Sequence, residues 1–139
     1  MNVQSATPAD IFQQSLRAMQ SGDVESYLAL CTDDVVVEFP FAPSGRPARV
    51  EGREALGRYL AAIAITSRIE ALALSNLEFH QTVNPDVAIA EMTIAGRIKG
   101  TGEPYKRSYV GVLTVREGRI ARYRDYWNPL ESLSASQEG

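Results

Sequence analysis

The residues with the clearest potential for chemistry lie in the stretch IARYRDYWNP, residues 120 to 129. In an extended strand, alternate side chains point to opposite faces. One face would carry Tyr123, Asp125 and Trp127, and the other would carry Arg122, Arg124 and Tyr126. An acid among large aromatic residues suits acid–base chemistry, because burial raises the pKa of a carboxyl group. The alternative is that Asp125 forms a surface ion pair.

The turns predict which residues lie beside this acid. If Glu117-Gly118 forms a two-residue hairpin turn, Val110 lies opposite Asp125. A second such turn at Thr101-Gly102 would place Glu91 opposite Val112. The sequence therefore predicts that Asp125 and Glu91 share one face of the sheet.

Two carboxyl groups on one half-buried face repel each other, which raises at least one pKa. We expect Asp125 to transfer a proton while Glu91 or Tyr123 polarises or positions a ligand. The alternative is that one of the acids pairs with Arg97 or Lys106 near the end of the sheet.

Apolar residues from the strands and helices are expected to form the wall of a binding pocket. The predicted lining residues are Trp127, Phe39, Tyr59, Phe12, Val110 and Val112. The opposite face of the sheet combines arginine and tyrosine, which are favoured at protein interfaces. It is predicted to form a homodimer through Tyr109, Leu113, Arg122, Arg124 and Tyr126, the alternative being a solvated outer face.

Composition excludes several classes of function. The 139 residues carry a net charge of −3 and a pI near 5.2, which argues against binding nucleic acid. The chain has one histidine, His80, and one cysteine, Cys31, which are too few of the usual ligands for a typical zinc site. No nucleotide-binding glycine motif is present. We therefore expect no metal and no cofactor, and the orientation of His80 is left open. With no apolar run of about 20 residues and no signal peptide, the chain is expected to be cytoplasmic.

The elements that must position these residues follow from periodicity and turns. Helices are predicted from Pro8 to Ser21, from Asp23 to about residue 31, and over 53–65, with a strand at 35–39. Four strands follow at 68–83, 86–99, 104–116 and 119–128. This order predicts one α+β domain over 1–139, with flexible ends at 1–6 and 132–139.

Three segments resemble the SnoaL-like branch of the nuclear transport factor 2-like superfamily. They are SGDVESYLALCTDDVVVEFPF (21–41), VEGREAL (50–56) and the stretch from 90 to 130. The resemblance implies a cone-shaped α+β barrel, in which three N-terminal helices pack on a curved, mainly antiparallel sheet. It also implies a deep apolar pocket and, usually, a dimer.

The resemblance also bears on single residues. The positions of the catalytic tyrosine and aspartate of ketosteroid isomerases hold Ser15 and Phe39 here. Arg124-Asp125-Tyr126 is similar to a segment of limonene epoxide hydrolase whose aspartate is catalytic, and phenazine-biosynthesis relatives also carry an acid there. The Arg-x-Asp pair that completes the hydrolase site is replaced by Glu91-Met92-Thr93.

The residues and the resemblance together predict a cofactor-independent acid–base enzyme of the isomerase, cyclase or hydratase type. Its ligand would be small, apolar, and cyclic or carbonyl-bearing. One alternative is a dimeric binding or accessory protein without turnover. Another is a dimerisation domain with a filled core, although two inward acids would then be costly.

Overall fold

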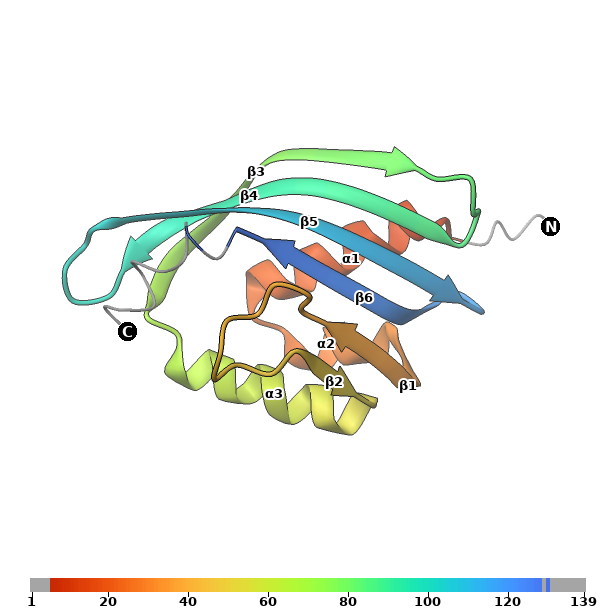
Figure 1. Ribbon diagram of the computed structural model, residues 1–139, viewed down its shortest axis with the longest axis horizontal. Helices are drawn as coiled ribbons and strands as arrows, with labels where there is room; N and C mark the ends of the chain where they lie inside the picture. Colours follow the sequence, from red (N-terminus) through yellow and green to blue (C-terminus); the bar gives the residue numbers. More distant parts are fainter. Residues whose placement is uncertain (1–5, 129, 131–139) are drawn as a thin grey trace.

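In the computed structural model, three helices lie against one face of a six-stranded sheet (Figure 1). The structure describes residues 6–128 and 130. Apart from Ala6, the ends predicted to be flexible lie outside this part of the chain.

The three helices are α1 (Pro8–Ser21), α2 (Val24–Ala29) and α3 (Arg53–Thr66). The predicted caps are confirmed: Thr7 accepts the backbone N–H of Asp10, and Asp23 accepts that of Ser26. Gly22 ends α1 in the left-handed conformation (φ 71°), which glycine adopts without steric cost. No helix in the described part of the chain is long and apolar enough to cross a lipid bilayer.

The strands are β1 (Cys31–Glu38), β2 (Arg49–Glu51), β3 (Ile69–Gln81), β4 (Val87–Ile98), β5 (Pro104–Arg116) and β6 (Arg119–Trp127). They pair in the order β2-β1-β6-β5-β4-β3, and only the β1–β6 contact is parallel. The α+β class is therefore confirmed, with a curved sheet that does not close (Figure 1).

Two parts of the N-terminal half differ from the prediction. β1 begins at Cys31, four residues before the predicted strand, because Cys31 already pairs with Ile120 of β6, whose N–H donates to the Leu30 carbonyl at 2.8 Å. The three-residue strand β2 was not predicted. It pairs with β1, where Arg49 contacts Glu38 and Glu51 at 3.1 Å and 2.6 Å.

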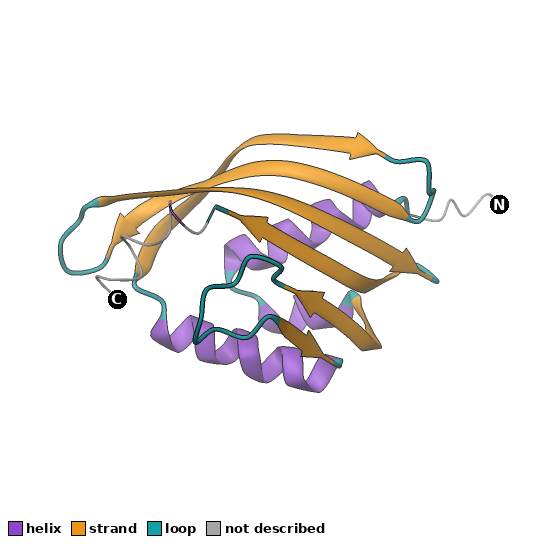
Figure 2. Ribbon diagram, in the orientation of Figure 1, coloured by secondary structure: helices purple, strands orange, loops and turns teal. Residues whose placement is uncertain are grey.

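The helices cover only one face of the sheet (Figure 2). We call this the inner face and the other the outer face. Side chains of α1, α3, β1, β5 and β6 meet on the inner face to form the core, in which the largest fully buried ones are Phe12, Leu56, Leu113, Ile120, Val35 and Cys31.

The predicted turn between β5 and β6 is confirmed. Glu117 and Gly118 both have positive φ (53° and 78°), as a two-residue type I′ turn requires, and Arg116 lies opposite Arg119. The predicted register is nevertheless wrong beyond the turn. Val115 pairs with Ile120 but Thr114 pairs with Arg122, so one extra residue on β6 forms a bulge.

Beyond the bulge, each residue of β6 lies opposite a β5 residue one position away from the predicted partner. The β6 side chains therefore share a face with the other set of β5 side chains. Asp125 lies opposite Gly111 rather than Val110, and Tyr123 lies opposite Leu113 rather than Val112. A one-residue slip moves every side chain to the other face. The shared face predicted for Asp125 and Glu91 is therefore wrong.

The hairpin between β4 and β5 also differs from the prediction. Glu91 pairs with Val110 rather than Val112, because the loop holds four residues between Ile98 and Glu103 instead of two. This shift of two residues leaves the faces unchanged.

Candidate active site

Asp125 lies on the inner face, beside a cavity of about 160 Å³ between α1 and the sheet. Aliphatic, aromatic and a few polar side chains line it. These are Phe12, Ser15, Leu16, Met19, Gln20, Tyr27, Leu72, Ala73, Leu74, Met92, Ile94, Tyr109, Tyr123 and Asp125. Met19 and Leu72 are about half exposed (53% and 48%), so they lie where the cavity opens to solvent.

The site depends on a glycine in the strand next to Asp125. A Cβ atom at Gly111 would overlap the Tyr123 hydroxyl group and lie 2.8 Å from the ring of Phe12. The absence of a side chain lets the Tyr123 ring cross β5, where it meets Phe12 edge-on at 5.6 Å between centroids. Gly111 thereby places one hydroxyl group and one aromatic wall beside the carboxyl group.

The carboxyl group of Asp125 is the electrostatic centre of the cavity. Its Oδ1 atom is buried and accepts no hydrogen bond from any described residue. Burial raises the pKa of Asp125 from 3.8 to about 7, and the positive charge of Arg107 opposes this increase. Near neutral pH, the group is therefore present in both its acidic and its basic form.

Three tyrosines on the cavity wall are electrostatically coupled to Asp125. Burial raises the pKa of Tyr27, Tyr109 and Tyr123 above the ordinary value, and the charge of Asp125 adds to the increase. All three therefore keep their hydroxyl protons at neutral pH and remain hydrogen-bond donors.

Arg107 contacts Tyr109, one of these three tyrosines. Its guanidinium carbon lies 5.5, 5.7 and 5.4 Å from the ring centroids of Tyr105, Tyr109 and Trp127. One N–H donates to the Tyr109 hydroxyl oxygen at 3.1 Å, so the hydroxyl proton points elsewhere. Arg107 Nε is buried without a hydrogen-bond partner among the described residues.

The structure brings some of the predicted site residues together. Asp125, Tyr123 and Phe12 all line the cavity, and Ser15 is a buried neighbour whose hydroxyl group donates to the Phe12 carbonyl at 2.7 Å. Three other predicted wall residues form an aromatic cluster that does not line the cavity. Phe39 contacts Tyr59 at 5.5 Å and Trp127 at 5.8 Å between centroids.

Other predicted site residues face away from the cavity. Glu91 is exposed on the outer face and bonds His80 at 2.7 Å, while Val110 (39% exposed) and Val112 lie on the same side. Their assignment to the site of Asp125 is wrong because of the β6 bulge.

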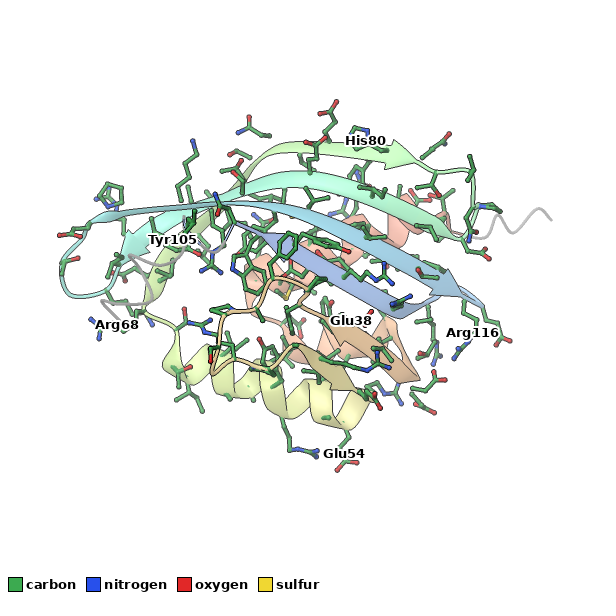
Figure 3. The ribbon with its side chains drawn as sticks, in the orientation of Figure 1. Glu38, Glu54, Arg68, His80, Tyr105 and Arg116 are labelled. Atoms are coloured by element: carbon green, nitrogen blue, oxygen red, sulfur yellow. The ribbon has the colours of Figure 1, made fainter. Side chains whose placement is uncertain are left out.

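The surface ion pair considered for Asp125 belongs to a different acid. Arg122 and Arg124 bond Glu38 on the outer face, at 2.6 Å and 3.3 Å, and Figure 3 shows Glu38 on β1. Hydrogen bonding to Arg122, followed by that to Arg124, keeps the pKa of Glu38 below its ordinary range. Arg122 and Arg124 therefore do not neutralise Asp125, the acid that follows them on β6.

Two residues assigned to the dimer surface are inward instead. Tyr109 lines the cavity and Leu113 is fully buried in the core. The sequence also missed Tyr27 and Arg107 as neighbours of Asp125. The sequence does indicate that Arg107 and Tyr109 lie on the same face of β5 as Gly111, because the three residues are spaced by two. Only the bulge in β6, however, places Asp125 on that face.

The fold and the cavity define a class: a small α+β protein with an ionisable carboxyl group in a mainly apolar cavity. Residues 12–123 match the family model of the SnoaL-like domain, and the chain belongs to this family.

This chain is similar to several known proteins. An uncharacterised PhzA/B-like protein of Pseudomonas aeruginosa is 35% identical over 126 residues, covering 91% of this chain and 87% of the relative. A Bacillus subtilis structure described as a "Putative Isomerase" is 33% identical, with a TM-score of 0.84 and coverage of 95% and 94% of the two chains. A Mycobacterium tuberculosis protein, crystallised in complex with estradiol-17β-hemisuccinate, is 26% identical, with a TM-score of 0.71 and coverage of 88% and 95%.

Proposed function

We propose that this protein is an enzyme of the isomerase or cyclase type that transfers a proton on a small carbonyl-bearing ligand held beside Asp125. The observation that carries this proposal is the buried carboxyl group itself, whose Oδ1 lacks a partner in the described chain. A purely structural acid would be expected to have its hydrogen bonds satisfied. A catalytic acid or base is most effective when its pKa lies near the working pH, as that of Asp125 does at about 7.

Tyr109 would supply the second group that the reaction needs. Removing a proton next to a carbonyl group places negative charge on the carbonyl oxygen, and a hydrogen-bond donor stabilises that charge. The Tyr109 hydroxyl oxygen already accepts a bond from Arg107, so its own proton is available to the ligand. In this scheme Asp125 takes a proton from carbon and returns it to another position, while Tyr109 binds the oxygen.

The size of the cavity sets the size of the ligand. A cavity of about 150 Å³ accommodates a molecule such as benzene, and this one measures about 160 Å³. We therefore favour a ligand with a single ring or a comparable branched chain. The complex of the Mycobacterium tuberculosis relative supports a cyclic ligand, and a larger one would require Met19 and Leu72 to move at the opening.

Exchange of carbon-bound protons tests the proposal without knowledge of the natural substrate. The protein is incubated in D₂O with single-ring ketones such as cyclohexenone, and deuterium incorporation next to the carbonyl group is followed by NMR. We expect Asp125→Asn to lower the exchange rate at least 100-fold, because it removes the group that moves the proton. Glu103→Gln, which changes an exposed acid in the β4–β5 loop, is the matched control and should exchange at the wild-type rate.

The pH dependence gives an independent check. The exchange rate of the wild-type protein should rise with pH, with its midpoint near pH 7 where Asp125 loses its proton, and level off at higher pH. Equal rates for the wild-type and Asp125→Asn proteins, or a rise centred near the ~3.9 of an unperturbed aspartate, would contradict the assignment. Ligand binding that persists without any exchange would favour a binding protein instead.

A further inference from the structure

The outer face of β3 and β4 carries a second group of ionisable side chains. The sheet separates this group from the cavity on the inner face. Glu78 and His80 are two residues apart on β3, and Glu91 lies directly opposite Glu78 on β4. One ligand-type atom from each of the three lies within 4.8 Å of the other two. Figure 3 shows His80 on the side of β3 away from the helices.

The backbone of β3 is built so that these side chains converge. Ser75 pairs with Thr93 and Glu78 with Glu91, so β3 holds one extra residue, and Asn76 adopts a positive φ of 54°. This bulge returns Glu78 to the face that Glu91 occupies. Phe79 points inward, where its ring contacts Phe12 at 5.6 Å, which leaves Glu78 and His80 pointing outward together.

The charges of this group are incompletely balanced. Carboxylates directly opposite each other on neighbouring strands destabilise a sheet. His80 Nε2 bonds Glu91 Oε2 at 2.7 Å, but Glu78 makes no hydrogen bond or ion pair with another described residue. The flanking outward residues Ile89, Thr93 and Val110 carry no charge, so a positive ligand would relieve the repulsion.

We propose that Glu78, His80 and Glu91 bind a divalent transition-metal ion, with Zn²⁺ as the representative ion. One imidazole and two carboxylates form a ligand set that Zn²⁺ accepts, with metal–ligand distances of about 2.0–2.2 Å. Ligand atoms around such an ion lie about 3.4 Å apart by this geometry. His80 Nε2 and Glu91 Oε2, now 2.7 Å apart, must therefore separate slightly, and ligand atoms that lie up to 4.8 Å apart must approach each other. Exposed side chains achieve both changes by small rotations.

The surroundings suit a site with open coordination positions. Glu78 and Glu91 also line an open groove of about 570 Å³ on the outer face, formed with Phe41, Val110, Tyr126 and Asn128. Three protein ligands on one side of an ion leave its other positions directed toward this groove, where water or a small anionic molecule has access.

Calorimetric titration with ZnCl₂ tests the site on the full-length, tag-free protein after treatment with a chelator. We expect one Zn²⁺ per chain, and a loss of affinity of at least tenfold in His80→Asn and in Glu78→Gln, since each removes a ligand. Glu70→Gln changes an exposed acid on the same strand and should bind Zn²⁺ as the wild type does. All the substituted residues are exposed, so each variant should remain folded, which circular dichroism checks.

The single histidine makes NMR an unambiguous second measurement. The ring resonances of His80 should shift on addition of one equivalent of Zn²⁺, and Mg²⁺ at the same concentration should leave them unchanged, because Mg²⁺ prefers oxygen ligands. The proposal is overturned if ZnCl₂ gives no saturable heat, if the His80 resonances do not move, or if both variants retain wild-type affinity. Equal binding of Mg²⁺ would likewise overturn it, since the imidazole would then have no role.

Discussion

At the scale of the residue, Asp125 is an acid held in a place that destabilises its charged form. Buried charges in proteins are usually paired, and β6 carries Arg122 and Arg124 shortly before Asp125, yet both of these arginines bond Glu38 on the outer face. The inner face instead surrounds Asp125 with three tyrosines whose hydroxyl protons remain in place. The local arrangement thus keeps an ionisable carboxyl group buried at a cost in stability, as the proposed proton-transfer role requires.

This view predicts that Asp125→Asn stabilises the protein. The pKa of Asp125 is 3.8 when unperturbed and about 7 in the fold, so folding takes up a proton between these values. The wild-type contribution to stability is therefore greatest below pH 4, falls as pH rises to 7, and is constant above it. The full difference corresponds to about 4 kcal/mol at most, and we expect about half of it to be recovered, because a buried amide also requires hydrogen-bond partners.

Urea denaturation at two pH values measures this effect. Asp125→Asn should be more stable than the wild-type protein by about 2 kcal/mol at pH 8, and the difference should disappear near pH 4. Other ionisable groups are common to both proteins and cancel in the comparison. A variant that is less stable at both pH values would show that Asp125 serves the fold instead.

At the scale of the element, one extra residue in β6 separates the predicted site from the observed one. The helix caps, the long strands and the turn at Glu117-Gly118 were all predictable, because each depends on neighbours in sequence. The bulge depends on how Ile120 and Arg122 meet β5, a contact between strands that leaves no local pattern. Tyr123 and Asp125 were therefore placed on one face correctly, but Glu91, Val110 and Val112 were joined to them wrongly.

The turn itself offers a test of the observed backbone. Glu117 has a φ of 53°, which is unfavourable for most side chains and tolerated by asparagine. Glu117→Asn should therefore raise the free energy of unfolding by about 0.5 kcal/mol, measured by urea denaturation. Glu117→Ala removes the same charge without favouring positive φ and should not be stabilising. Stabilisation by alanine alone would assign the effect to charge and contradict the turn conformation.

At the scale of the whole molecule, the sheet separates two surfaces with different chemistry. The inner face encloses the cavity of Asp125, and the outer face carries the groove, the Glu38 network and the cluster around His80. The sequence predicted that the outer face forms a homodimer. The structure changes the composition of that surface, because Tyr109 and Leu113 face inward while Arg122, Arg124 and Tyr126 remain outside.

The revised surface makes the dimer testable through residues on the groove. Phe41 is 56% exposed and packs against Tyr126 at 5.4 Å, and Val110 is 39% exposed nearby. If a second copy covers this face, Val110→Asp places an unpaired charge inside the interface and should convert the protein to a monomer. Light scattering after size exclusion measures the mass, and Ile65→Asp, on the exposed side of α3, is the matched control and should leave it unchanged. A wild-type monomer, or a dimer that tolerates Val110→Asp, would show that the outer face does not join two copies.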